Sequence, residues 1–98
     1  GTGSWLLEGV SGNRAFASSC HGAGRLMSRS EAKKTIDGKA LKRELESRGI
    51  RVHANTPNIM SEEAPDAYKD VDEVIRLSNS AGLTKPIARM SPLAVIKG

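Results

Sequence analysis

The alternation of apolar and polar residues predicts short strands at both ends of this chain and one in its middle. Apolar runs at residues 5–10, 87–90 and 93–96 are typical of strands. At residues 50–54, apolar side chains alternate with polar ones, as in a strand with one buried face. His53 falls on the polar side of that alternation and is predicted to lie on the surface.

A second apolar stretch follows the first strand closely. Residues 11–13 read Ser-Gly-Asn, a composition typical of turns, and residues 15–17 are apolar again. We interpret this pattern as a hairpin that delivers His21 to the end of a sheet.

Two helices are predicted between residues 28 and 49. Ser28 stands three residues before Glu31, the spacing of a capping box, and indicates that a helix starts there. Asp37 can cap a further helix, and Gly49 is placed to end it. The Lys, Arg and Glu residues of this second helix form either a solvated face or an RNA contact. Their mixture of charges favours the solvated face.

A third helix is predicted after a loop. Residues 56–65 contain two prolines and little periodicity, which indicates a loop. Asp70 and Glu73 again have capping-box spacing, and Gly82 is placed to end the helix that they begin. The order of elements predicts an α/β or α+β fold, with a mixed sheet and about three helices.

Composition limits the architecture and the class of partner. The chain has 98 residues, 38% hydrophobic and 3% aromatic, which allows one domain with a thin aliphatic core. It lacks an initiator methionine and runs into apolar residues almost at once, so we expect it to be part of a larger protein. The net charge of +4 permits a nucleic-acid partner without requiring one.

Cysteine content and hydropathy point to a reducing compartment. Cys20 is the single cysteine, which excludes an internal disulfide framework. No stretch is long and apolar enough for a signal peptide or a membrane span. A cytoplasmic setting without membrane contact is expected.

The run Ser19-Cys20-His21-Gly22-Ala23-Gly24-Arg25 carries the strongest chemical signal. Glycines let the backbone approach an anionic ligand, histidine supplies a nitrogen nucleophile, and arginine is a forked phosphate partner. The run fits phosphoryl or nucleotidyl transfer. Taken locally, it also fits an ordinary surface turn.

Four motifs in this order give the chain a resemblance to the RtcB RNA ligases. They are GTGS at residues 1–4, SSCHGAGRLMSR at 18–29, EEAPDAYKDVDEV at 62–74 and ARMSPLAVIKG at 88–98. The resemblance spans nearly the whole chain and places it in the carboxy-terminal part of an RtcB-like ligase domain. It implies a GTP- and manganese-dependent ligase that joins RNA 2′,3′-cyclic phosphate or 3′-phosphate ends to 5′-hydroxyl ends.

The resemblance also implies roles for individual residues. His21 matches the family's nucleophile, which attacks the α-phosphate of GTP and becomes guanylylated. The adjoining positions match backbone that lines the nucleotide, namely Gly22, Ala23 and Gly24. Imidazole nitrogen is a competent nucleophile, and the phosphoramidate that it forms can pass GMP onward.

Residues of the other motifs would complete the nucleotide pocket. By the same resemblance, Tyr68 stacks on guanine, and Lys97 and Ser4 contact the base. Without it, Tyr68 reads as a packed loop aromatic and Lys97 as a solvated chain-end lysine. Arg25 follows the nucleophile and is a candidate phosphate contact.

The resemblance implies a role in tRNA splicing or RNA repair, with RNA ends such as tRNA halves and GTP as substrates and an archease-like activator as a partner. The family's manganese ligands precede this segment, so none is expected here and the segment alone should be inactive. Trp5 stands where a smaller aromatic residue is expected. A non-catalytic nucleotide- or RNA-binding module is the alternative function. A weaker possibility is an oligomer that covers its own exposed surfaces.

Overall fold

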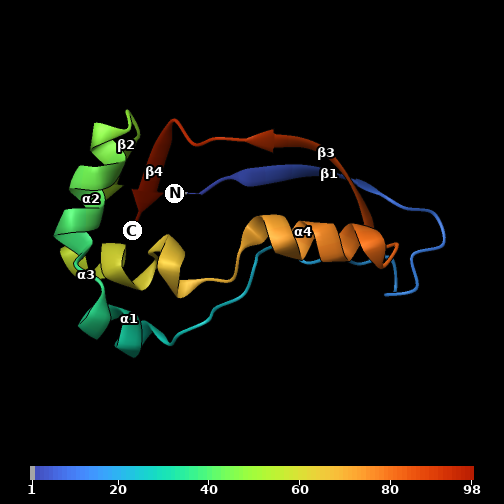
Figure 1. Cartoon of the computed structure of the whole chain (residues 1–98), viewed down its shortest axis with the longest axis horizontal. Coiled ribbons are helices and arrows are strands. Elements are labelled where there is room, and N and C mark those ends of the chain that lie inside the picture. Colours follow the sequence, from blue (N-terminus) through green and yellow to red (C-terminus); the bar gives the residue numbers. More distant parts are fainter. Residues whose placement is uncertain (1) are drawn as a thin grey trace. The chain divides into compact units, whose positions relative to one another are not determined.

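The computed structural model describes residues 2–98 and contains two small sheets and four α-helices (Figure 1). In chain order, the elements are β1 (Ser4–Gly9), α1 (Arg29–Thr35), α2 (Gly38–Ser47), β2 (Arg51–Ala54), α3 (Pro57–Glu62), the 3-10 helix η1 (Pro65–Ala67), α4 (Val71–Ser80), β3 (Thr84–Met90) and β4 (Ala94–Lys97). Strand β1 pairs with β3 in antiparallel fashion, and β2 pairs with β4 in parallel. The predicted α/β class is confirmed. The strands form two separate pairs, and there is one helix more than expected.

These elements form two compact units. Unit 1 comprises Arg25–Tyr68 and Pro92–Gly98, and therefore holds α1, α2, α3, η1 and the β2–β4 sheet. Unit 2 comprises Thr2–Gly24 and Lys69–Ser91, and holds α4 and the β1–β3 sheet. Each unit is described by itself below.

Side-chain caps start α1 and α2 of unit 1 where the sequence predicts. The hydroxyl of Ser28 accepts a hydrogen bond from the backbone N–H of Glu31, at 3.1 Å, at the start of α1. The carboxylate of Asp37 accepts from the first backbone N–H groups of α2, and these bonds lower its pKa. Both caps satisfy donors that a helix end leaves without a partner.

The core of unit 1 lies between α2, α3 and the β2–β4 sheet. Its buried residues are Leu45, Ile50 and Met60, and partly buried side chains pack around them, namely Leu41, Val52, Ala54 and Val95. His53 is exposed on the opposite face of β2, so the predicted alternation is confirmed. A core of this size is thin, as the composition indicates.

Helix α3 corrects the prediction of a loop at residues 56–65. Thr56 caps this helix by accepting a hydrogen bond from the backbone N–H of Ile59, at 3.3 Å, and Pro57 occupies the first turn. Proline is favoured there because its missing N–H is not needed and its φ already suits a helix. The two prolines therefore mark the starts of α3 and η1.

In unit 2, helix α4 lies against the β1–β3 sheet (Figure 1). Asp70 caps α4, as predicted, by accepting from the N–H of Asp72. The carboxylate of Asp72 accepts hydrogen bonds from the indole of Trp5, at 2.8 Å, and from the guanidinium of Arg89, at 3.0 Å. These two bonds join the helix to both strands and lower the pKa of Asp72, that from Arg89 more than that from Trp5.

The predicted hairpin at residues 15–17 is wrong. That stretch forms turns, and the partner of β1 is β3, far along the chain. Asn13 organises the turns, because its amide donates to the carbonyls of Ser18 and Leu83, and its side-chain oxygen accepts from the N–H of Ala15. Apolar character alone cannot distinguish such a turn from a strand.

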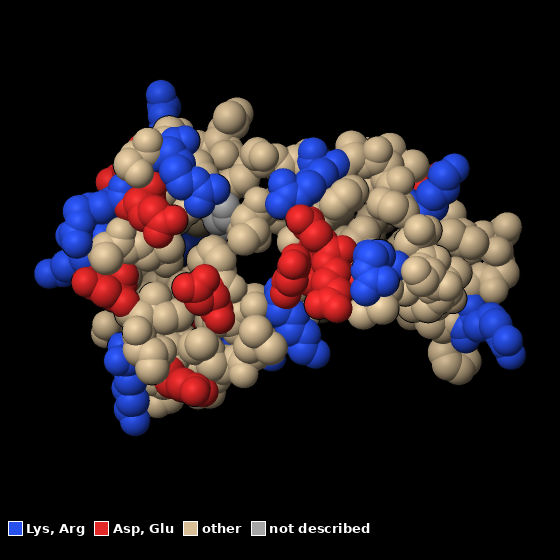
Figure 2. Space-filling view, viewed as in Figure 1, with Lys and Arg blue, Asp and Glu red and all other residues tan. Residues whose placement is uncertain are grey.

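The surface carries mixed charge and exposed apolar side chains. Lys, Arg and Glu side chains alternate over α2 (Figure 2), and two ion pairs lie along it, Lys42 with Glu46 and Arg48 with Glu44. This is the solvated face that the sequence favours. The large exposed apolar residues are Leu6, Phe16, Leu26, Leu77, Ile87, Met90, Leu93 and Ile96. Within residues 2–98, no helix is long and apolar enough to cross a bilayer.

Candidate functional site

The predicted nucleophile lies in an exposed loop of unit 2. His21 and its neighbour Cys20 are both exposed, and the backbone bends at His21 and Gly22. No helix or strand holds this loop, which runs between β1 and α1 in the chain. The imidazole of His21 is therefore accessible from solvent within unit 2.

The two glycines beside His21 differ in what the backbone requires. Gly24 has a φ of +76°, a conformation that strains residues with a Cβ atom. Gly22 is outside that region, and a Cβ built on it would meet nothing within 4 Å. The local fold of unit 2 thus needs glycine at 24 and does not need it at 22. A ligand that approaches the backbone closely would explain glycine at position 22.

Ser4 lies on a different element of unit 2. It is the first residue of β1, it is exposed, and it pairs across the sheet with Met90. Its hydroxyl is therefore placed at the end of the β1–β3 sheet.

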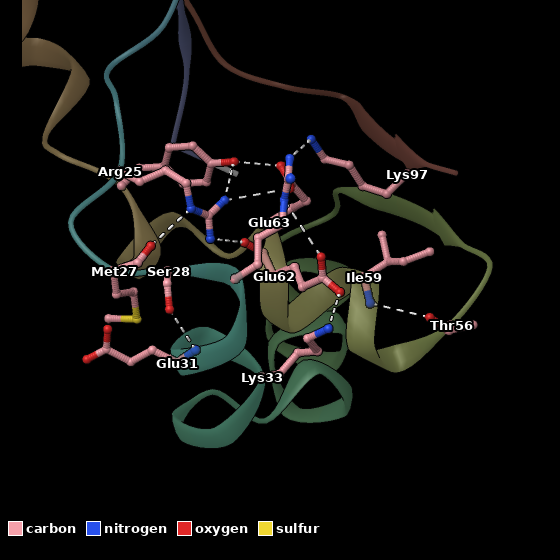
Figure 3. A network of polar contacts seen from close by, with 12 residues as sticks. Arg25, Met27, Ser28, Glu31, Lys33, Thr56, Ile59, Glu62, Glu63 and Lys97 are labelled. Atoms are coloured by element: carbon pink, nitrogen blue, oxygen red, sulfur yellow. Dashed lines mark hydrogen bonds and ion pairs between the residues drawn. The ribbon is translucent and has the colours of Figure 1, made fainter.

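Arg25 is the centre of a polar network in unit 1 (Figure 3). Its Nε donates to the carbonyl of Met27, at 3.0 Å, and one Nη donates to the carbonyl of Glu62, at 2.6 Å. The other Nη donates to the hydroxyl of Tyr68, at 2.8 Å. The guanidinium carbon also lies 4.6 Å from the centre of the Tyr68 ring, a cation–π distance. A phosphate contact, which stays a prediction, would have to use the N–H groups that these partners leave.

The hydroxyl of Tyr68 is engaged on both sides. It accepts from Arg25 and donates to the Glu63 carboxylate, at 2.6 Å. This bond lowers the pKa of Glu63, which burial raises and the charges of Lys97, Arg25 and Arg29 lower further. The same bond, with burial and the charge of Glu63, raises the pKa of Tyr68. At neutral pH, Tyr68 is therefore a phenol and Glu63 a carboxylate.

Lys97, the last residue of β4, reaches the same carboxylate. Its ammonium lies 3.9 Å from an oxygen of Glu63, an ion pair rather than a hydrogen bond. The side chain is 38% exposed, so the ammonium is also open to solvent. Unit 1 thus brings together around Glu63 the two cationic residues and the aromatic residue that the sequence singled out, namely Arg25, Lys97 and Tyr68.

Glu63 is the residue of this cluster that the sequence analysis missed. It belongs to the motif at residues 62–74 and lies five residues before Tyr68 in the chain. The turn that α3 and η1 form brings its carboxylate onto the phenol of Tyr68. A Thr-Pro pair at 56 and 57 was the available signal for that helix. His21, Gly22, Ala23, Gly24 and Ser4 belong to unit 2, and the structure describes them separately.

Manganese ligands do not occur as a cluster in the part of the chain that the structure describes. No group of three or more His, Cys, Asp or Glu side chains among residues 2–98 could hold a metal ion. A manganese ion is usually held by several oxygen or imidazole donors. The described residues 2–98 therefore offer no such group of donors.

Comparison with known proteins supports the family that the motifs indicate. The model of the tRNA-splicing ligase RtcB family matches residues 1–98. An RNA-splicing ligase RtcB of Mycobacterium bovis is 48% identical over the whole of this chain, and tRNA-splicing ligases RtcB of Methanopyrus kandleri and Pyrococcus horikoshii are 48% and 45% identical. The chain belongs to the RtcB family.

The match covers a small part of each relative. This chain corresponds to 23% of the length of the Mycobacterium bovis protein, 10% of the Methanopyrus kandleri protein and 12% of the Pyrococcus horikoshii protein.

Proposed function

We propose that this chain is the carboxy-terminal segment of a longer RNA ligase and supplies its nucleophile, His21. The full-length ligase joins RNA ends bearing a 2′,3′-cyclic phosphate or 3′-phosphate to 5′-hydroxyl ends, as in tRNA splicing or RNA repair, and consumes GTP. The observation that carries this proposal is the exposed His21 beside Gly22, in a chain whose whole length matches the RtcB family.

His21 has the surroundings that a nucleophile toward phosphorus requires. A neutral imidazole carries a free nitrogen lone pair, and the side chain of His21 is exposed rather than packed in a core. Nothing lies within 4 Å of the Cβ position of Gly22, so the loop has room for a phosphate group on this side. These features support attack on a nucleotide phosphate at this loop.

The proposed ligation has three steps, and each step forms one bond and breaks another. A ring nitrogen of His21 attacks the α-phosphorus of GTP, so a P–N bond forms, the bond from the α-phosphorus to the bridging oxygen breaks, and pyrophosphate leaves. An oxygen of the RNA 3′-phosphate, which water releases from a 2′,3′-cyclic end by opening the ring, then attacks the same phosphorus, and the P–N bond breaks. Finally, the 5′-hydroxyl of the second RNA end attacks the activated 3′-phosphate, loses its proton, and expels GMP.

The Arg25, Tyr68 and Lys97 cluster suits a purine base. Arg25 lies over one face of the Tyr68 ring, so a base would stack on the opposite face. The ammonium of Lys97 can donate hydrogen bonds to acceptor atoms on the edge of guanine. This cluster belongs to unit 1, whereas His21 and Ser4 belong to unit 2.

Manganese would be held elsewhere in the longer protein. When bound, it would neutralise the triphosphate and polarise the attacked phosphorus. The segment alone is therefore expected to be inactive.

Exposed apolar residues support a segment rather than a free-standing module. Leu93 and Ile96 of unit 1 are 86% and 76% exposed, and Leu6 and Ile87 of unit 2 are 54% and 52% exposed. Large apolar side chains this exposed, where they lie together, ordinarily mark contacts with other protein. We propose that the remainder of the ligase covers them.

An RNA-joining assay tests the proposal. The full-length ligase should seal an RNA 3′-phosphate end to a 5′-hydroxyl end in the presence of GTP and Mn²⁺, and His21→Ala should abolish sealing. His53→Ala provides the matched control, because His53 is also an exposed histidine of this chain and has no assigned role. Sealing by the His21→Ala variant would refute the proposal, and binding of GTP or RNA without sealing would favour the non-catalytic binding module.

A further inference from the structure

One carboxylate in unit 1 contacts residues from three separate parts of the chain. Glu63 accepts a hydrogen bond from Tyr68, at 2.6 Å, and forms ion pairs with Arg25, at 3.6 Å, and with Lys97, at 3.9 Å. Arg29 adds a further ion pair, at 3.6 Å. Figure 3 shows the side chains of Arg25 and Lys97 directed toward Glu63 from different parts of the chain. The Glu63 side chain is 23% exposed, so solvent screens these contacts only in part.

The geometry at Lys97 leaves its donors available. An N–O distance of 3.9 Å attracts the ammonium electrostatically without consuming its N–H groups in a hydrogen bond. A free lysine side chain loses substantial rotamer entropy when a ligand fixes it. The attraction to Glu63 removes part of this cost before any ligand arrives, which is preorganisation.

The geometry at Tyr68 fixes the plane of its ring. The hydroxyl accepts from Arg25 and donates to Glu63, and the guanidinium of Arg25 covers one face. A ring held in this way presents its opposite face in a single orientation. Stacking on that face then requires no further ordering of the side chain.

We infer that Glu63 is a positioning residue for nucleotide binding, which sets the Lys97 ammonium and the Tyr68 ring in place for a purine base. This inference rests on the proposed function, because it assigns a nucleotide to the cluster. Glu63 acts through its two neighbours and need not touch the nucleotide. Its pKa, lowered by the same contacts, keeps it charged at neutral pH.

The neighbouring carboxylate offers a matched control. Glu62 pairs with Lys33, at 3.1 Å, and with Arg29, at 3.8 Å, and neither partner is a candidate for base contact. Its link to Arg25 runs through the backbone carbonyl, which Glu62→Ala retains. Glu62→Ala therefore removes a carboxylate of similar burial from the same network without releasing Tyr68 or Lys97.

The test uses the full-length ligase with two readouts, covalent labelling by α-labelled GTP and calorimetric binding of GMP. Glu63→Ala should raise the KM for GTP in labelling, and the Kd for GMP, by about tenfold, because the charge-assisted contact of Lys97 with the base is weakened when Lys97 is no longer held in place. The labelling kcat should stay within about twofold of the wild-type value, because the lost binding energy contributes equally to the bound substrate and to the transition state. Glu62→Ala should leave the KM and the Kd unchanged.

Two further variants separate positioning from a structural role. Glu63→Gln keeps an acceptor for Tyr68 and loses the charge that holds Lys97, so it should still fold, with a lower melting temperature than the wild type, and should still raise the KM. In a Lys97→Ala background, Glu63→Gln should raise the KM much less than it does alone, because the two residues act as one unit.

Unchanged KM and Kd in Glu63→Gln, or effects of Glu63→Gln and Lys97→Ala that simply multiply, would overturn the inference. A wild-type protein that binds GMP but takes no label would refute the proposed ligase function, and the Kd values would still decide the role of Glu63. A wild-type protein that neither binds GMP nor takes label would overturn both.

Discussion

The phenol of Tyr68 donates a hydrogen bond of 2.6 Å to the carboxylate of Glu63, five residues earlier in the chain. The guanidinium of Arg25 donates to the same phenol oxygen, so the hydroxyl is satisfied as donor and acceptor. This arrangement turns an otherwise ordinary loop tyrosine into a fixed ring. It also makes the protonation of one carboxyl group matter for the whole cluster.

The first prediction concerns pH. The pKa of Glu63 is lowered from its ordinary value of 4.5, mainly by the bond from Tyr68. A carboxyl group whose pKa is lower in the folded state stabilises the fold at any pH above its pKa in the unfolded state. This stabilisation is lost as the pH falls through the pKa of the folded state. The melting temperature of the full-length ligase should therefore exceed that of its Glu63→Gln variant at neutral pH. The difference should shrink as the pH falls below 4.5.

The pKa values of Asp37 and Asp72 are also lowered in the folded protein, so these carboxylates add to the loss of stability in acid. Comparison with Glu63→Gln isolates the contribution of Glu63. A difference in melting temperature that stays constant through the acid range would contradict this assignment.

The second prediction concerns Gly22. Because its backbone is unstrained for an L residue and its Cβ position is open, Gly22→Ala should change the melting temperature very little. The added methyl group should obstruct a bound nucleotide, and labelling by α-labelled GTP should fall by at least about tenfold, the effect of a small misplacement at a reacting centre. Gly24→Ala should lower stability as well, because its φ is +76°. Normal labelling of Gly22→Ala would show that this glycine serves no ligand.

A third prediction tests packing away from the site. A Cβ at Gly38 would clash with the carbonyl oxygen of Pro57 and lie 2.8 Å from the hydroxyl oxygen of Ser61, so α2 and α3 would have to separate. Gly38→Ala should destabilise the protein by about 1–3 kcal/mol in denaturant unfolding, as overpacking generally does. Gly9→Ala is the control, since nothing lies within 4 Å of its Cβ position. Equal stability of the two variants would be evidence against this helix contact.

Local signals in the sequence were sufficient for most helices. Ser28, Asp37 and Asp70 each cap a helix through their own side chain, so a few adjacent residues determine where α1, α2 and α4 begin. The alternation at residues 50–54 likewise depends on one buried face. Such features require no knowledge of distant contacts.

Features that depend on distant partners were missed. Strand β1 pairs with β3, which follows α4 in the chain. No local pattern reveals that the apolar stretch at residues 15–17 does not form the partner strand of β1. The role of Glu63 requires α3 and β4 to converge within unit 1. Motif resemblance named Tyr68 and Lys97, but only the structure shows which carboxylate connects them.

A fourth prediction addresses the exposed apolar surface. Leu93 is 86% exposed in this segment, yet we propose that the rest of the ligase covers it. Leu93→Ser should then destabilise the full-length protein by about 1.5–3 kcal/mol, the usual value for burying such a side chain. Lys39→Ser, a change at an exposed position of α2, should be nearly neutral. A Leu93→Ser variant as stable as the wild type would mean that this surface stays open to solvent.

The most direct test of the central claim is covalent transfer of label from α-labelled GTP to the full-length ligase in the presence of Mn²⁺. The account predicts an acid-labile label that mass spectrometry places on His21, absent from the His21→Ala variant and from the isolated segment of residues 1–98. Label that persists on the His21→Ala variant, or that maps to another residue, would contradict the assignment of His21 as the nucleophile.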